Sequence, residues 1–376
     1  MPLNKKIIPY GHQWIDGADI NAVVKVLKSD WLTQGPVVEK FEKAVAKYCK
    51  AKYGVAFSSG TAALYCAYRS AGIKQGDEVI TSPLTFAATS NMLAMLGAVP
   101  IFADVDEETL TIDSKEIEKK ITKKTKAIVA IDFAGHPCEY DEILKIAKKN
   151  NLFLIEDACH ALGAEYKGKK IGSFADMTVL SFHPVKHITT GEGGMVLTNN
   201  KDFYEKLKLF RNHGIEKKPE NGTWYYEILE PSFNFRISDI QCALGLSQLK
   251  KINKFLKKRR EIAKKYKKEL SKINDLKLPM EKDYVKSAWH LYSIRITKDR
   301  KKFFDYLTKN GIGAQVHYMP LHMHPFYKNK FNYKEGDFPI AEDYYKKAVS
   351  LPIFYSLTKK DFEKVIRIIK NYDRKK

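Results

Sequence analysis

The sequence has 376 residues, a length that predicts two or three domains and a large core. Hydrophobic residues make up 44% of it and charged residues 29%, which is typical of an ordinary soluble protein. There is no run of about 18 apolar residues, and the N-terminus lacks the apolar stretch of a signal peptide. We therefore expect a protein that neither spans a membrane nor is secreted.

The formal net charge of +21 is unusual for such a chain. Lysines occur along its whole length without a recognisable nucleic-acid module, so we interpret them as solvated helix faces and expect no nucleic-acid partner. Attraction of an anionic ligand, such as a nucleotide diphosphate, is the functional alternative. The cysteines are scattered and odd in number, and no pair has metal-ligand spacing. The cysteines are Cys49, Cys66, Cys138, Cys159 and Cys242. From their pattern we predict a reduced, cytoplasmic protein without a metal site.

Short apolar runs alternate with helical patterns through the first half of the chain. Residues 1–16 are expected to form an arm, and residues 19–27 a helix with one apolar face. A turn-rich loop follows from Asp30 to Pro36. Strands are predicted at residues 54–57, 78–81, 99–105, 127–132, 152–155, 177–182 and 195–198. This order predicts an α/β fold with a mostly parallel, doubly wound sheet of about seven strands.

The pattern changes after residue 198. We expect a helix at 202–213, a loop at 215–233, a capped helix after 234–239 and then a long basic helix. The remaining elements are a strand at 289–296, a helix at 301–310, a strand at 314–318 and two C-terminal helices. We therefore predict an arm (1–16), a large domain (17–250) and a smaller α+β domain (251–376).

Polar chemistry is concentrated where two of the predicted strands end. The first strand ends in Glu156-Asp157, and the second is followed by Lys186 within FHPVKHITTGEGG. A buried lysine can form a Schiff base, and a carboxylate can pair with a pyridine nitrogen, so the two suggest pyridoxal phosphate (PLP). The plainer interpretations remain open at this point: Asp157 as a helix cap, and Lys186 as one more surface charge.

Such a cofactor also needs a phosphate site and a ring contact. Ser59, Gly60 and Thr61 follow a strand and begin a helix, where free N–H groups bind phosphate, although the same residues could be a plain N-cap. Phe86 follows a strand and could stack on a planar ring, although most phenylalanines are core residues. Ser181 could add a hydroxyl to the phosphate site.

Five segments resemble the DegT/DnrJ/EryC1/StrS family of sugar-nucleotide aminotransferases, in the same order and across nearly the whole chain. The segments are SSGTAAL, PLTFAAT, EDACHALGA, SFHPVKHITTGEGG and NFRISDIQCALGLSQL. The resemblance implies the aspartate-aminotransferase-like PLP fold (fold type I). It also implies an obligate homodimer with shared active sites. FAGHPCEYDEI and AQVHYMPLH further resemble the branch of the family that makes pseudaminic-acid precursors.

The resemblance assigns roles to individual residues. Lys186 and Asp157 match the catalytic lysine and the partner of the ring nitrogen. The other cofactor contacts implied are Ser59, Gly60, Thr61, Phe86, His160, Ser181 and, from the second subunit, Asn234. The sugar-nucleotide contacts implied are Tyr10, Asp30, Trp31, Leu32, Thr33, Gln315, Val316, His317 and Tyr318, with Arg236 as an additional cation.

The function implied is transfer of the glutamate amino group to C4 of a UDP-linked 4-keto-6-deoxy-N-acetylhexosamine. Some relatives carry histidine at the lysine position and are sugar dehydratases, whereas this chain keeps Lys186 in place. Three alternatives stay open. They are a dTDP- or GDP-sugar aminotransferase, a PLP-dependent sugar dehydratase, and a non-enzymatic, lysine-rich nucleic-acid-binding or regulatory protein.

Overall fold

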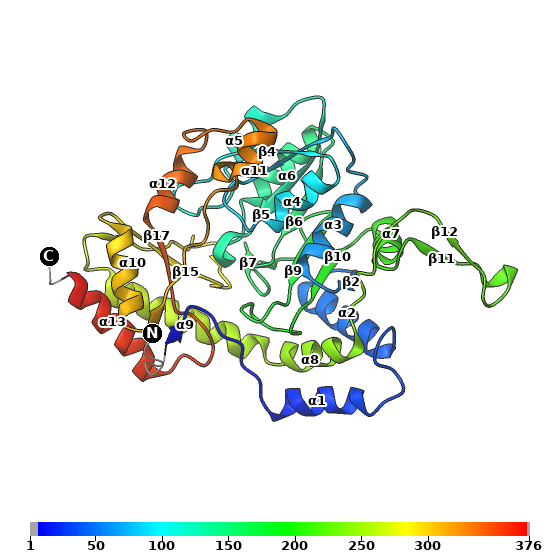
Figure 1. Cartoon of the computed structure of the whole chain (residues 1–376), viewed down its shortest axis with the longest axis horizontal. Coiled ribbons are helices and arrows are strands. Elements are labelled where there is room, and N and C mark those ends of the chain that lie inside the picture. Colours follow the sequence, from blue (N-terminus) through cyan, green and yellow to red (C-terminus); the bar gives the residue numbers. More distant parts are fainter. Residues whose placement is uncertain (1–6, 374–376) are drawn as a thin grey trace.

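The computed structural model describes residues 7–373. A seven-stranded sheet forms the centre of the molecule (Figure 1). Six strands run parallel, and β10 is antiparallel to both of its neighbours. In spatial order the strands are β2 (Tyr53–Phe57), β10 (Gly194–Thr198), β9 (Met177–Ser181), β6 (Phe153–Asp157), β5 (Thr125–Ile131), β3 (Glu78–Thr81) and β4 (Val99–Phe102). The predicted mostly parallel sheet is confirmed.

Helices cover both faces of this sheet. Successive side chains of a strand point to opposite faces, so Ile128 and Val129 of β5 enter two different hydrophobic clusters. One face is covered by α3 (Gly60–Ser70), α4 (Ala88–Met95) and α7 (Lys201–Arg211). The other is covered by α2 (Pro36–Cys49), α5 (Ser114–Lys120), α6 (Tyr140–Lys149) and α8 (Asp239–Leu249). Burial on both faces explains why the strands read as continuous apolar runs.

A third hydrophobic cluster forms the core of the C-terminal part. It joins α9 (Ile252–Leu270), α10 (Arg300–Lys309) and α13 (Lys359–Asp373) to a small sheet. That sheet consists of β13 (Leu276–Lys277), β15 (Tyr292–Ile296) and β17 (Ala348–Leu351). The cluster also contains Ile8 of the N-terminal segment, because β1 (Ile8–Pro9) pairs with β16 (Ile312–Gly313).

Helix α1 (Gly17–Leu27) lies along α8 in the large part. The remaining elements link the two parts: α11 (Pro325–Phe331) and α12 (Pro339–Lys347) pack with Phe102 and Phe133 of the large part. β7 (Glu165–Tyr166), β8 (Lys169–Lys170) and β14 (Val285–Lys286) form a small sheet between them. Three short 3₁₀ turns complete the fold, at Phe133–Gly135, Pro219–Asn221 and Leu321–Met323.

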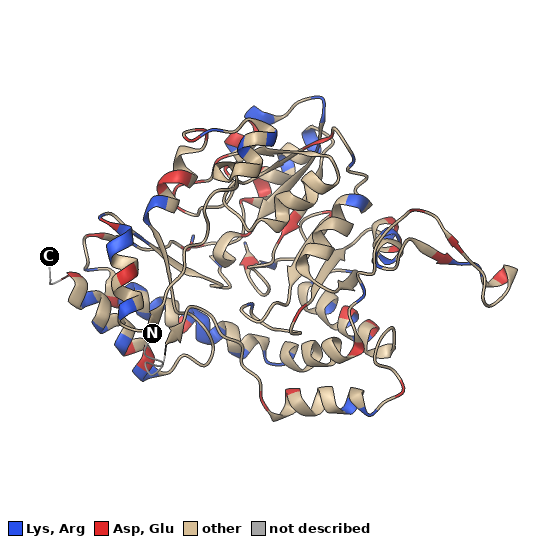
Figure 2. Cartoon of the chain, viewed as in Figure 1, with Lys and Arg blue, Asp and Glu red and all other residues tan. Residues whose placement is uncertain are grey.

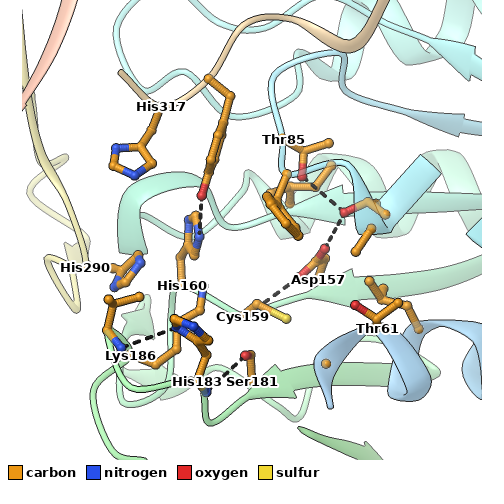
Figure 3. A pocket seen from close by; sticks show the side chains of 18 of the residues that line it. Thr61, Thr85, Asp157, Cys159, His160, Ser181, His183, Lys186, His290 and His317 are labelled. Carbon is orange, nitrogen blue, oxygen red and sulfur yellow. Dashed lines mark hydrogen bonds between the residues drawn. The ribbon is translucent and has the colours of Figure 1, made fainter. Parts of the chain in front are cut away.

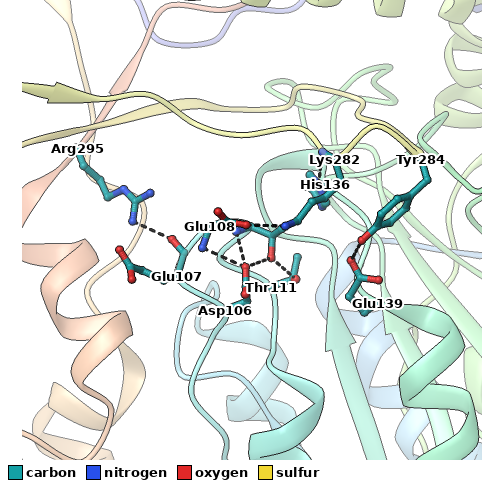
Figure 4. A network of polar contacts seen from close by, with 10 residues as sticks. Asp106, Glu107, Glu108, Thr111, His136, Glu139, Lys282, Tyr284 and Arg295 are labelled. Carbon is teal, nitrogen blue, oxygen red and sulfur yellow. Dashed lines mark hydrogen bonds and ion pairs between the residues drawn. The ribbon is translucent and has the colours of Figure 1, made fainter. Parts of the chain in front are cut away.

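Polar contacts also join the two parts (Figure 4). Arg295 donates to the backbone oxygen of Glu107 at 2.9 Å, and Lys282 pairs with Glu108 at 2.5 Å. The Tyr284 hydroxyl donates to Glu139 at 2.5 Å. These contacts hold the chain on both sides of His290 against loops of the large part.

Three expectations about the second half of the chain are wrong. Residues 314–318 are not a strand, because only Gln315 bridges to Ser350 and the neighbouring side chains line a cavity. Residues 215–233 contain a hairpin, β11 (Ile215–Lys217) with β12 (Tyr226–Ile228), whose polar composition hides its pairing. The C-terminal region holds three helices (α11, α12 and α13) instead of two.

Lys and Arg lie on helices around the described chain, with many on α9, α10 and α13 (Figure 2). Within residues 7–373, no helix combines the length and the apolar character needed to cross a membrane.

Candidate active site

A cavity of about 610 Å³ lies where the carboxyl ends of β2, β3, β6 and β9 meet (Figure 3). This is the edge at which parallel sheets collect functional groups. It brings together predicted residues that are far apart in the sequence: Tyr10, Ser59, Gly60, Thr61, Phe86, Asp157, His160, Ser181, Lys186, Gln315, Val316, His317 and Tyr318.

Lys186 lies in the turn between β9 and β10, half-buried at the cavity wall. Its backbone N–H donates to the backbone oxygen of His183 at 2.9 Å, and this hydrogen bond fixes the turn. Burial lowers the pKa of the Lys186 amine, and Arg259 acts in the same direction, whereas Cys159 and Asp157 oppose the shift. A lowered pKa increases the fraction of neutral amine, the form that can attack a carbonyl carbon.

Asp157 is the last residue of β6, and its side chain is only 5% exposed. Its Oδ2 accepts a hydrogen bond from the Thr89 hydroxyl at 2.7 Å, and its Oδ1 accepts one from the Cys159 N–H at 3.2 Å. The carboxylate therefore has a defined orientation at the cavity wall. Asp157 is not a helix N-cap, because no described helix begins directly after it.

The N-terminus of α3 forms one end of the cavity. Ser59 is its N-cap, and its hydroxyl accepts from the Ala62 N–H at 3.1 Å, as the plainer interpretation states. Gly60 lies against the last residue of β9, so a Cβ there would come within 3.1 Å of the Ser181 Cβ. The backbone at Gly60 and Thr61 thus lies open beside the Ser181 hydroxyl, an arrangement that suits a phosphate group.

Aromatic and imidazole rings line the opposite side. Phe86 is 58% exposed, and its ring centroid lies 6.1 Å from that of Tyr318. The Tyr318 hydroxyl lies 3.4 Å from His160 Nε2. Burial lowers the pKa of His160 well below the ordinary value, with Lys186 as the next contribution, so this ring is neutral at pH 7. Flat, uncharged groups of this kind suit a planar ring.

The N-terminal segment contributes to the outer end of the cavity. The rings of Tyr10 and His317 lie 4.9 Å apart, and His317 Nδ1 contacts the Ser350 hydroxyl at 2.9 Å. Burial, with a smaller contribution from Lys186, lowers the pKa of His317 to about 4. The outer end is therefore built from uncharged rings at pH 7.

Some predicted residues do not line this cavity in the single chain. Asn234 bridges to Asn212, and Arg236 donates to the Asn212 side chain at 2.5 Å, on another part of the surface. Asp30, Trp31, Leu32 and Thr33 are all exposed and also lie outside it.

Sequence reasoning missed several residues that line the cavity. Thr85 and Thr89 are among them, although both lie in the quoted PLTFAAT segment four residues apart, a spacing that places two side chains on one face of a helical turn. His290 enters from the C-terminal part, and its ring centroid lies 4.3 Å from that of His160. No local signal marks His290, because its position depends on domain packing.

These residues fit PLP. The cavity offers a phosphate cradle that a Cβ would fill, a lysine, a buried carboxylate and an aromatic ring at its mouth. Within residues 7–373, no three His, Cys, Asp or Glu side chains are placed to hold a metal ion.

The chain matches known proteins over nearly its whole length. Residues 13–370 match the model of the DegT/DnrJ/EryC1/StrS aminotransferase family. A Campylobacter jejuni protein (serotype O:23/36, strain 81-176), UDP-4-amino-4,6-dideoxy-N-acetyl-beta-L-altrosamine transaminase, is 44% identical over 94% of each chain.

Two solved structures extend the comparison. Helicobacter pylori PseC, an aminotransferase involved in the biosynthesis of pseudoaminic acid, is 38% identical with a TM-score of 0.92, covering 99% of this chain and 100% of its own. Spr1654 from Streptococcus pneumoniae, in its PLP form, is 30% identical with a TM-score of 0.93, covering 98% of this chain and 99% of its own. The predicted PLP fold type I is confirmed, and the chain belongs to the DegT/DnrJ/EryC1/StrS aminotransferase family.

Proposed function

We propose that this chain uses PLP to move the amino group of glutamate to C4 of a UDP-4-keto-6-deoxy-N-acetylhexosamine. The product would be UDP-4-amino-4,6-dideoxy-N-acetyl-β-L-altrosamine, an intermediate of pseudaminic-acid biosynthesis. The observation that carries the proposal is the one cavity that holds the Lys186 amine, the Asp157 carboxylate and the open N-terminus of α3. The activity of the Campylobacter jejuni relative supports the choice of sugar.

When bound, PLP supplies an aldehyde for the amino group and a ring that accepts the electron pair left at the reacting carbon. Lys186 would hold the cofactor through Nζ. Once released, its neutral amine would take the proton from Cα of glutamate and later give a proton to C4 of the sugar. The lowered pKa of Lys186 favours both roles. The negative charge of Asp157 would keep a proton on the ring nitrogen.

The other cavity residues would bind and orient. The N–H groups of Gly60 and Thr61 and the Ser181 hydroxyl would hold the phosphate, and Phe86 would cover the ring. Tyr10 and the Gln315–Tyr318 segment would contact the sugar nucleotide.

We also propose that the active unit is a homodimer. Asn234, Arg236 and Asp30–Thr33 lie outside the cavity of their own chain, and a second copy could supply them. Large apolar side chains are exposed on these and neighbouring elements, which favours a surface that a partner covers. They are Ile20, Val24 and Leu27 on α1, Trp31 and Leu32 in the following loop, and Trp224, Tyr226, Ile228 and Phe233 around the hairpin. A cytoplasmic location remains a prediction.

The test of the reaction is a substrate panel. The purified protein is incubated with PLP, glutamate and UDP-, dTDP- or GDP-linked 4-keto-6-deoxy sugars, and the products are identified by mass and NMR. We expect a new amine on the UDP-N-acetyl sugar and stoichiometric 2-oxoglutarate. Turnover of only a dTDP or GDP sugar would overturn the substrate assignment, and loss of a sugar oxygen without a new amine would indicate a dehydratase.

A further inference from the structure

The hydroxyl groups of Thr85 and Thr89 form a chain that ends on Asp157 (Figure 3). Thr89 Oγ1 lies 2.7 Å from Asp157 Oδ2, and Thr85 Oγ1 lies 3.1 Å from Thr89 Oγ1. All three side chains are at most 5% exposed. Water therefore has little access to these contacts, and each hydroxyl depends on its neighbour for a partner.

The direction of the chain follows from the number of hydrogens. An ionised carboxylate can only accept, so Thr89 must use its single hydroxyl hydrogen on Asp157. Thr89 is then the acceptor in its contact with Thr85, and Thr85 must be the donor. Both hydroxyl dipoles therefore point toward Asp157, and each makes the other a better donor.

Thr89 is held firmly in this position. It lies in the first turn of α4, and its backbone oxygen accepts a hydrogen bond from the Tyr68 hydroxyl at 3.0 Å. Tyr68 itself is fully buried. The backbone N–H of Thr89 lies 3.3 Å from the oxygen of Phe86, so the turn that carries the ring contact also carries the donor to Asp157. A donor with so little freedom can fix the carboxylate in one orientation.

We propose that Thr89, supported by Thr85, is a positioning residue that keeps the Asp157 carboxylate aimed at the nitrogen of the cofactor ring. This inference rests on the proposed use of PLP. A donor fixed beside the carboxylate holds its oxygens in one orientation, and a negative charge aimed at the ring nitrogen favours the protonated form of that nitrogen. Neither threonine needs to touch the substrate for this role.

The alternative is that the two hydroxyls merely satisfy one another inside the core. The two cases differ in what they predict for ring chemistry. If the two hydroxyls serve only the core, removing one should affect the binding of cofactors with and without a ring nitrogen equally. A positioning role acts only through that nitrogen, because the ring nitrogen is the proposed partner of Asp157.

The experiment compares PLP with its 1-deaza analogue, in which C–H replaces the ring nitrogen. Cofactor-free wild-type protein, Thr89→Val and Thr89→Ser are titrated with both ligands, and binding is followed by fluorescence. Thr81→Val is the matched control, because Thr81 is also fully buried but its hydroxyl donates to the Val129 backbone oxygen at 3.1 Å. Melting of the cofactor-free proteins reports on folding.

We expect Thr89→Val to weaken PLP binding about tenfold, the size of one hydrogen bond to a charged group, and to leave binding of the analogue within about twofold. Thr89→Ser should restore PLP binding, and Thr81→Val should change neither ligand. Equal weakening of both ligands by Thr89→Val, or no weakening of PLP, would overturn the inference.

A second variant covers the case in which Thr89→Val does not fold. Thr85→Val removes only the donor to Thr89, and we expect about a threefold loss of PLP affinity with the analogue unaffected. Unchanged PLP affinity in Thr85→Val would then overturn the inference. Failure of the wild-type protein to bind PLP would instead contradict the proposed function, so the two failures are distinct.

Discussion

The carboxyl groups of Asp132 and Glu156 interact with each other inside the protein. Asp132 directly follows β5, and Glu156 is the next-to-last residue of β6. Both side chains are fully buried. One oxygen of Asp132 accepts from the Tyr140 hydroxyl at 2.7 Å, and one oxygen of Glu156 accepts from the Thr178 hydroxyl at 2.5 Å. Asp132 Oδ2 and Glu156 Oε1 have no hydrogen-bond donor within residues 7–373, and the two buried carboxyls interact with each other, so we predict that one proton is shared between them.

This pair predicts a specific dependence of stability on pH. Burial raises the pKa of both carboxyls, and repulsion by Glu156 adds to the shift of Asp132. The native state therefore keeps a proton that the unfolded chain releases above about pH 4. The stability that the pair contributes is fully present below that pH. It is lost as the pH rises toward the folded-state pKa, by up to about 1.4 kcal/mol per pH unit.

Asp132→Asn isolates this effect, because an amide donates a hydrogen to Glu156 without titrating. We expect the free energy of unfolding of the variant to fall less steeply between pH 5 and pH 7 than that of the wild type. Urea unfolding at several pH values measures both slopes. Identical slopes would show that no proton is shared between Asp132 and Glu156.

Lys186→Ala should abolish both the visible absorbance of bound PLP and turnover. Among residues 7–373, Lys186 is the one lysine that lines the cavity, so we expect a loss of at least about 10³-fold in kcat. Lys257→Ala, on the exposed side of α9, is the control and should behave as wild type. Normal amino transfer by the Lys186 variant would contradict the assigned role of this lysine.

Gly60→Ala should weaken PLP binding. The new methyl group would lie 3.1 Å from the Ser181 Cβ, so it would push the phosphate cradle open. We expect about a tenfold loss of PLP affinity, measured by fluorescence titration. Gly17→Ala is matched to it, because Gly17 also begins a helix but has nothing within 4 Å of its added Cβ. If both variants bind PLP like the wild type, the cradle does not hold the phosphate.

Hybrid dimers test whether two chains share each active site. Lys186→Ala and Asn234→Ala homodimers should both have low activity. When the two chains are mixed and allowed to exchange, each hybrid dimer should regain one intact site, because one chain supplies Lys186 and the other Asn234. Light scattering checks that dimers form. Hybrids that form but gain no activity would show that Asn234 serves its own chain or has no role.

The chemistry at the strand ends could be predicted from the sequence, because it depends on local pattern. Asp157 is the last residue of β6, and Ser181 is the last residue of β9. Both strands are buried on both faces, so their apolar runs mark them clearly. The local pattern failed at residues 314–318, since their apolar and aromatic side chains line the cavity instead of forming a strand.

The sequence alone was enough to locate the cofactor motifs around Asp157 and Lys186, because strand ends and helix starts are local features of the chain. Only the tertiary structure decided which distant side chains join them. His290 reaches His160 because Arg259 holds the backbone oxygens of Trp289 and His290, each at 3.2 Å, from another helix. Thr89 reaches Asp157 across 68 positions of sequence, because β3 and β6 end at the same edge of one sheet. Contacts of this range depend on packing between elements, which no local pattern records.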